Sequence, residues 1–261
     1  MSQGRYFAGI DVGTSYIKAV VIDEKNEIVG SFIERSGADL QKSIASVFKG
    51  LTSATNVPQN AIKHITATGF GRRNVSIANS VKTEISCHAK GAYHFFPRNI
   101  TIIDIGGQDT EIIKINEQGK ILGFKMNRKC AAGTGVFLEE IAHKLNIPLS
   151  EMNVLAAKST KDVALSSFCT VFASTEILTR IKEGEKVEDM IKSAFESVAK
   201  RVIEMDILDG TIVSTGGVIE YNDILVKILG KYVEKKVLIP PHPQLIGAVG
   251  AALCAKELAK D

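Results

Sequence analysis

An α/β protein with two related lobes is the fold class that this sequence predicts. Strand-like and helix-like segments are interspersed along the chain, and one strand–turn–strand pattern occurs twice. The 261 residues are enough for two lobes of roughly 100–150 residues each. We expect lobe I to comprise residues 1–97 together with a C-terminal helix at 246–261, and lobe II to comprise residues 98–245.

The repeated pattern covers 21 residues in each copy. Ile10–Gly30 (IDVGTSYIKAVVIDEKNEIVG) aligns without a gap with Ile103–Gly123 (IDIGGQDTEIIKINEQGKILG), and seven positions are identical. Two unrelated hairpins would share their alternation by chance. They would less readily share an aspartate and a glycine at matching points of both turns. We therefore interpret the repeat as two lobes that each open with a β-meander.

The elements of lobe I follow from local patterns. Apolar, β-branched runs separated by glycine and polar turns indicate strands, and apolar residues with helical spacing indicate helices. Leu40, Ile44, Val47, Phe48 and Leu51 have such helical spacing. The expected strands are 6–11, 17–22, 28–33 and 62–68, and the expected helices are 38–51 and 84–93.

The elements of lobe II follow its meander. The expected helices are 134–145, 150–158, 170–182, 187–206 and 222–235, and the expected strands are 211–214 and 237–239. Pro240 and Pro241 then interrupt the chain before a last helix at 246–258, which is rich in alanine and glycine.

Composition narrows the range of functions. The chain is 45% hydrophobic and 23% charged, which is typical of a globular protein. The net charge of +3 and the lack of a long Lys/Arg run argue against nucleic-acid binding. No apolar stretch reaches 18 residues and no signal peptide is evident, so we expect a cytoplasmic protein without a membrane span. In that compartment its four cysteines are expected to be thiols or metal ligands.

The glycine turns that follow the repeated aspartates have a physical use. Glycine lets backbone N–H groups approach a phosphate, and the hydroxyls of Thr14 and Ser15 add donors. Asp11 and Asp104, one from each lobe, are candidates to hold Mg²⁺ through water. Gly216-Gly217 follows an apolar strand and would let an adenosine lie flat on the backbone. No GxxxxGK[ST] motif occurs, so this is not a P-loop enzyme.

These motifs resemble a known superfamily. GIDVGTSYIK, IDIGGQDTE and STGGV are similar to the phosphate and adenosine segments of actin, sugar kinases and heat-shock chaperone ATPases, and LIGAVGAAL is similar to their second connecting helix. The resemblance implies an actin-like, ribonuclease H-like fold that binds ATP or ADP and Mg²⁺ in a cleft between two lobes. The expected catalytic residues are Asp11, Asp104, Gln108 and Asp109. The expected nucleotide-binding residues are Gly13, Thr14, Ser15, Lys18, Gly106, Gly107, Gly133, Thr134, Gly216, Gly217, Val218, Gln244 and Gly247.

The four cysteines fall into two kinds. Cys87 and Cys254 lie in expected helices and are interpreted as small buried residues. Cys130, before a helix capped by Thr134, and Cys169, at the start of another, are both expected at helix N-termini, where the dipole favours a thiolate or an anionic cluster. Two ligands cannot hold a four-iron cluster, but a two-fold dimer would supply four. A single chain that uses all four cysteines is the alternative, although no CxxC pair supports it.

The segments around Cys130 and Cys169 add a more specific resemblance. KCAAGTGVFLE and SSFCTVFASTE are similar to the cluster-binding segments of the ATPase activators of 2-hydroxyacyl-CoA dehydratases, whose relatives include benzoyl-CoA reductase subunits and double-cubane cluster protein reductases. This resemblance implies a homodimer with one [4Fe-4S] cluster bridged by both cysteines of each subunit. It also implies electron transfer from ferredoxin or flavodoxin to a partner iron–sulfur dehydratase or reductase.

Two alternatives stay open. A small-molecule (sugar-type) kinase of the same fold would use the phosphate and adenosine turns but leave Cys130 and Cys169 without a role. A non-enzymatic nucleotide-binding regulator would hold no cluster and show little turnover.

Overall fold

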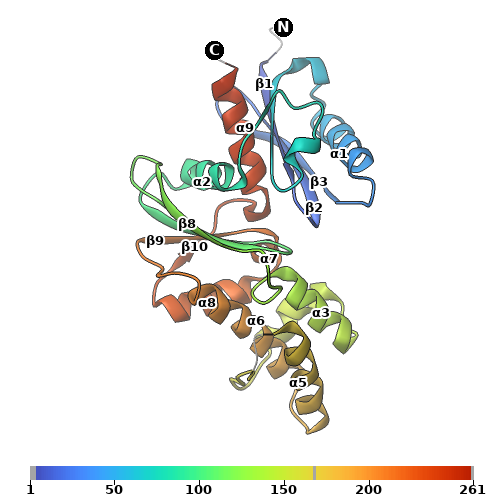
Figure 1. Cartoon of the computed structure of the whole chain (residues 1–261), viewed down its shortest axis with the longest axis vertical. Coiled ribbons are helices and arrows are strands. Elements are labelled where there is room, and N and C mark those ends of the chain that lie inside the picture. The colour runs from blue at the N-terminus through green and yellow to red at the C-terminus, as the bar shows by residue number, and fades with distance from the viewer. Residues whose placement is uncertain (1–3, 167–168, 260–261) are drawn as a thin grey trace. The chain divides into compact units, whose positions relative to one another are not determined.

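The computed structural model describes residues 4–166 and 169–259 (Figure 1). The chain forms two compact units, one of residues 1–98, 115–121 and 245–261, the other of residues 99–114 and 122–244. The α/β fold class expected from the sequence is confirmed, because each unit is organised around a five-stranded sheet with helices.

The first unit begins with the meander expected from the sequence. Strands β1 (Tyr6–Val12), β2 (Tyr16–Ile22) and β3 (Ile28–Arg35) pair antiparallel, and β4 (Ile62–Thr68) joins β1 in parallel. The two-residue strand β5 (Ser80–Val81) extends the sheet, giving the order β3-β2-β1-β4-β5.

Helices cover both faces of this first sheet. Alternate residues of β1, Ala8, Ile10 and Val12, pack with α1 (Leu40–Thr55). On the other face Phe7 packs with α9 (Ile246–Leu258), which also lies against α2 (Glu84–Phe95). Because a strand alternates its side chains between faces, Asp11 falls on the α9 side. Double coverage explains why all of β1 after Tyr6 is buried.

The second unit repeats this topology. Its strands are β6 (Ile100–Ile105), β7 (Thr110–Ile115), β8 (Ile121–Asn127), β9 (Thr211–Thr215) and β10 (Val237–Leu238), in the order β10-β9-β6-β7-β8. Read from the other edge this is a meander followed by two strands, as in the first unit. β9 pairs with β6 and β10 with β9, in both cases in parallel, as β4 and β5 do in the first sheet. The relatedness suggested by the sequence repeat therefore extends to the whole sheet.

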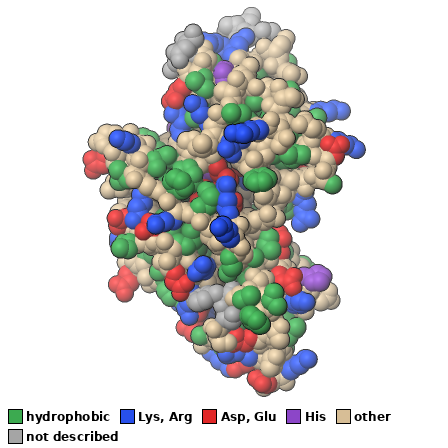
Figure 2. All heavy atoms as spheres, viewed as in Figure 1, with side chains coloured by type: hydrophobic (Ala, Val, Ile, Leu, Met, Phe, Trp, Pro, Cys, Tyr) green, Lys and Arg blue, Asp and Glu red, His purple; other side chains and the backbone are tan. Residues whose placement is uncertain are grey.

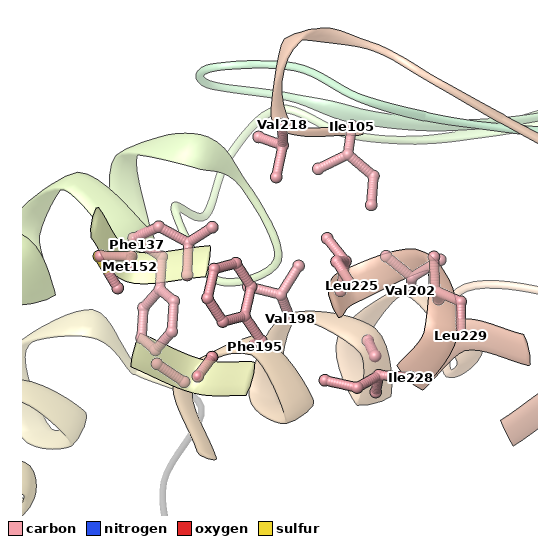
Figure 3. Close-up of a cluster of buried hydrophobic side chains, with 14 of the residues drawn as sticks. Ile105, Phe137, Met152, Phe195, Val198, Val202, Val218, Leu225, Ile228 and Leu229 are labelled. Carbon is pink, nitrogen blue, oxygen red and sulfur yellow. The ribbon is translucent and has the colours of Figure 1, made fainter. Parts of the chain in front are cut away.

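Helices fill one face of the second sheet with a large apolar core. They are α3 (Gly135–Leu145), α4 (Met152–Ala157), α5 (Thr170–Lys182), α6 (Val187–Ile203), α7 (Gly217–Tyr221) and α8 (Asp223–Val233). Ile103 and Ile105 of β6 contribute to the same core as Phe137 of α3 and Phe195 of α6. Figure 3 shows Ile105 of β6 and Val218 of α7 on one side of this core, with side chains of other helices, such as Phe137, Phe195 and Leu225, opposite.

Most element bounds agree with the sequence expectations, and 62–68, 170–182 and 246–258 agree to the residue. The expected helix at 150–158 is shorter, because Leu149–Glu151 after Pro148 forms a 3₁₀ turn and α4 starts only at Met152. The five-residue α7 and the two-residue β5 were not expected, since elements so short show no periodicity.

The tip of the β7–β8 hairpin belongs to the first unit. The Tyr93 hydroxyl donates to the Glu117 carbonyl over 2.6 Å, and Gly119 lies against the Tyr93 ring. Among the described residues no helix is both long and apolar enough to span a membrane. On the face drawn in Figure 2, basic and acidic side chains are interspersed with hydrophobic ones.

Candidate functional site

The turn after β1 is tight and partly exposed. Gly13 N–H donates to the Tyr16 carbonyl over 3.0 Å, and a Cβ at Gly13 would lie 2.9 Å from that oxygen. Ser36 holds the turn from outside, because its hydroxyl donates to Gly13 O (2.8 Å) and its N–H to Ser15 O (2.9 Å). The Thr14 side chain is exposed, so its hydroxyl is accessible to an anion at this turn.

Asp11, at the end of β1, carries a buried carboxylate with only 2% exposure. Its Oδ2 accepts from Lys18 Nζ at 3.0 Å, whereas its Oδ1 has no hydrogen-bond partner among the described residues. Such an oxygen is costly unless a cation or water meets it. Oxygen ligands of this kind are those that Mg²⁺ prefers, directly or through water, so Asp11 fits the magnesium role expected from the sequence.

Two glycines make room for this carboxylate. A Cβ at Gly69 would lie 2.4 Å from Asp11 Oδ1, and one at Gly247 would lie 3.2 Å from Asp11 Oδ2. Gly247 was expected at the nucleotide site, whereas Gly69 was not among the expected site residues. Gly69 directly follows Thr68, and Thr68 pairs with Asp11 in the parallel β1–β4 ladder. This pairing is what places Gly69 beside the carboxylate. Such a ladder brings the carboxyl ends of both strands to one edge of the sheet.

The turn of the second unit resembles the first. Gly106 N–H donates to Asp109 O over 2.9 Å, and Gln108 is exposed at the tip. Asp109 lies 3.4 Å from Nε of Arg128, so its carboxylate has a cationic neighbour. Asp104 is buried and its Oδ1 accepts from the Thr215 hydroxyl at 2.7 Å, because β6 and β9 are parallel neighbours that end at the same edge.

The expected adenosine segment, which begins with Gly216, directly follows Thr215 at the end of β9. Gly216 has φ of 102°, and a Cβ there would lie 2.3 Å from Ile105 O, so only glycine fits. Gly217 lies against Gln244, whose Oε1 accepts from Tyr221 at 3.2 Å. Val218 lies beside the start of α3, since a Cβ at Gly135 would be 3.1 Å from it and 3.2 Å from Gly107 Cα. The structure thus brings the expected residues Gly106, Gly107, Val218, Gly216, Gly217 and Gln244 together.

The segment before α3 differs from the expectation that Thr134 caps this helix. Thr134 occupies the N-cap position, but its hydroxyl donates to Ala131 O at 2.6 Å. The first helical N–H groups bind the phosphate turn instead, with Gly135 N donating to Gly106 O (3.0 Å) and Val136 N to Gly107 O (2.8 Å). The carbonyls of Gly106 and Gly107 therefore accept hydrogen bonds from N–H groups that have no partner within the helix and that a capping side chain would otherwise bind.

Cys130 and Cys169 are both exposed, and neither is in a disulfide. Cys169 is the N-cap residue of α5, as expected. Cys130 lies farther from its helix than expected, since the turn at 131–134 separates it from α3, and Asn127 Nδ2 holds that turn by donating to Cys130 O and Ala132 O at 3.0 Å each. The two following helices pack together, because Leu138 and Ile141 of α3 share the core with Ala173 and Ile177 of α5.

Cys87 and Cys254 are buried, in agreement with their interpretation as core residues. The hydrogen bond with Cys254 and burial both raise the pKa of the Cys87 thiol well above its usual range. A thiol held neutral in this way is a poor metal ligand. Cys254 is also buried, so the two exposed cysteines, Cys130 and Cys169, are the ones that fit as cluster ligands.

The expected site residues are thus divided between the two units. The first contains Asp11, Gly13, Lys18 and Gly247, with Thr14 and Ser15 in the same turn. The second contains the other nucleotide-binding candidates and both exposed cysteines. Gly133 and Thr134 belong to the turn that links Cys130 to α3.

Comparison with known proteins gives concordant results. The model of the BadF/BadG/BcrA/BcrD ATPase family matches residues 8–255. The chain is 38% identical over 259 residues to the 2-hydroxyisocaproyl-CoA dehydratase activator of Clostridioides difficile, covering 98% of this chain and 97% of the relative. It is also 38% identical to the (R)-2-hydroxyglutaryl-CoA dehydratase activating ATPase of Acidaminococcus fermentans, covering 98% and 99%.

A solved structure is similar to this chain over nearly its full length. The activator of the 2-hydroxyisocaproyl-CoA dehydratase from Clostridium difficile with bound ADPNP superposes with a TM-score of 0.92 and 37% identity, covering 98% of this chain and 96% of that one. The expected actin-like ATPase fold and the resemblance to dehydratase activators are confirmed by these likenesses.

Proposed function

Because this chain belongs to the BadF/BadG/BcrA/BcrD ATPase family, we propose that it is an ATPase that drives low-potential electron transfer to a partner iron–sulfur enzyme. The observation that carries the proposal is the pair of exposed cysteines, each followed by a helix of one shared core. The first of these helices is bonded through its N–H groups to the second glycine turn.

In this proposal the two glycine turns hold the nucleotide phosphates. Asp11 and Asp104 take Mg²⁺, Lys18 contacts phosphate, and Gln108 or Asp109 orients the attacking water. The unpartnered Asp11 Oδ1 supports the magnesium role, and the exposed Gln108 supports the water-orienting role. Gly216, Gly217, Val218 and Gln244 take the nucleoside, and Gly247 makes room for the Asp11 carboxylate.

Cys130 and Cys169 are the proposed ligands of a [4Fe-4S] cluster, which when bound supplies one-electron chemistry. Two ligands from each chain make four in a two-fold homodimer. Val171 and Phe172, which follow Cys169, are 68% and 67% exposed. Apolar side chains beside a shared group are suited to burial against a second copy of the chain.

ATP hydrolysis has an energetic purpose here. Moving one electron against ~0.3 V costs about 7 kcal/mol, which one or two ATP molecules can supply. The proposed donor is ferredoxin or flavodoxin, and the proposed acceptor is a 2-hydroxyacyl-CoA dehydratase or a double-cubane cluster protein. The proposed compartment is the cytoplasm. A kinase of the same fold is the weaker candidate, because it leaves the exposed Cys130 and Cys169 without a role.

The test is purification without oxygen, followed by the visible spectrum, iron and sulfide analysis and the mass in solution. The expected result is a brown dimer with about four irons per two chains. A chain that stays colourless after cluster reconstitution would contradict the electron-transfer role, and phosphorylation of small-molecule acceptors would then be assayed.

A further inference from the structure

We infer that Thr110 is a positioning residue that ties the second phosphate turn to the segment carrying Cys130. Thr110 directly follows the turn at 106–109 and begins β7. Its side chain is fully buried, with 0% exposure, and its hydroxyl donates to the Gly133 carbonyl over 2.6 Å. The bond joins a residue next to the turn with a residue three positions after Cys130.

The backbone makes a second connection between the same two segments. Gly135 N and Val136 N donate to the carbonyls of Gly106 and Gly107 at 3.0 and 2.8 Å. The first N–H groups of a helix have no partner within the helix, so these bonds fix the start of α3 to the turn. A shift of the turn must therefore move the start of α3 or break the bonds.

A third connection precedes Cys130. Arg128 Nε lies 3.4 Å from Asp109 Oδ2, and Arg128 Nη2 lies 3.5 Å from Glu111 Oε1. Arg128 is 40% exposed, so screening by water weakens these ion pairs. The buried Thr110 hydrogen bond is not screened in this way and is the stronger side-chain connection.

The accepting segment has little freedom to absorb a displacement. Gly133 has φ of 85°, and a Cβ there would lie 2.9 Å from Arg201 Cγ. Asn127 holds the carbonyls of Cys130 and Ala132 in the same turn. Movement of the Gly133 carbonyl is therefore transmitted to Cys130. The inference rests on the proposed function, since it assumes that the turn binds phosphate and that Cys130 is a ligand.

The test measures amide hydrogen exchange of the full-length protein, purified without oxygen, with and without ADPNP and Mg²⁺. In the wild type we expect the nucleotide to slow exchange in peptides covering both 106–111 and 129–136. In Thr110→Val, which keeps the shape but not the donor, we expect the effect to persist at 106–111 and to fall about two- to thirtyfold at 129–136. Thr110→Ser, which restores the hydroxyl, is expected to recover it.

Thr101→Val is the matched control. Thr101 is also buried in the second sheet, and its hydroxyl donates to Asp209 O at 2.8 Å, away from the turn. This variant loses an equivalent bond and is expected to keep the nucleotide response at 129–136. If T101V and T110V lose the nucleotide response at 129–136 equally, the loss reflects a general effect on stability and the inference is wrong. The inference is also wrong if T110V responds to the nucleotide as the wild type does.

If T110V does not fold, hydrogen exchange of the wild type alone can still test the inference. Exchange resolved to single amides must then show a nucleotide response at Gly135 and Val136, whose N–H groups bind the turn. A response at 106–111 without one at these amides overturns the inference and leaves the nucleotide site intact. No response at 106–111 contradicts the proposed phosphate turn itself.

Discussion

Gly247 lies directly against Asp11, so that a Cβ at position 247 would stand 3.2 Å from Asp11 Oδ2 and 2.7 Å from His88 Nε2. We predict that Gly247→Ala raises the Kd for ADPNP with Mg²⁺ by about tenfold or more, because overpacking costs about 1–3 kcal/mol and moves the carboxylate. Calorimetric titration with and without Mg²⁺ measures this. Gly123→Ala, where a Cβ would meet nothing within 4 Å, is the control and is expected to bind normally.

Asp11→Asn keeps the size of the side chain and removes its charge. We predict that ATP hydrolysis falls by about 10²–10³-fold, the usual cost of losing one group that stabilises charge in a transition state. The unpartnered Asp11 Oδ1 supports this, since the proposed role of that oxygen is toward Mg²⁺. Steady-state rates of ATP hydrolysis by the variant and the wild type, measured over a range of Mg²⁺ concentrations, test this prediction. A variant with unchanged rate and unchanged Mg²⁺ dependence would contradict the assignment.

The meander repeat, the bounds of most strands and the separation of exposed from buried cysteines could be predicted from the sequence. These features depend on local alternation and helical spacing. The role of Gly69, the bond from Thr110 to Gly133 and the true partner of Thr134 could not be predicted in this way. Periodicity tells which face a residue occupies, but it does not tell which distant segment that face meets. The parallel β1–β4 pairing, which puts Gly69 beside Asp11, joins strands about 50 residues apart.

Cys130→Ser and Cys169→Ser should separate the two proposed sites. We predict that each variant loses iron and visible colour but binds ADPNP with wild-type affinity within about threefold, because neither thiol belongs to the glycine turns. Iron analysis and calorimetric titration on the same preparation measure both properties. Cys254→Ala, at a buried cysteine, is the matched control and should keep its iron. Iron retained in both serine variants would exclude these cysteines as ligands.

The carboxylate of Asp189 predicts a pH dependence of stability. Burial raises its pKa, but hydrogen bonds from the Ser159 hydroxyl and the N–H groups of Thr160 and Lys161 outweigh burial, so the net pKa is lowered. An acid with a lowered pKa stabilises the fold at pH values above its ordinary value, about 3.9, and loses this effect as the pH falls through the folded value. Asp189→Asn should therefore be destabilised relative to the wild type at pH 7, and by less at pH ~3.5.

Urea unfolding of both proteins at the two pH values measures that difference. Glu196 offers a control of opposite sign, because burial raises its pKa. An acid of this kind contributes stability at low pH that is lost as the pH rises through the folded value. Glu196→Gln should accordingly gain stability relative to the wild type between pH ~3.5 and 7, whereas Asp189→Asn loses it. The same pH trend in both variants would show that general charge effects, and not the hydrogen bonds to Asp189, set the dependence.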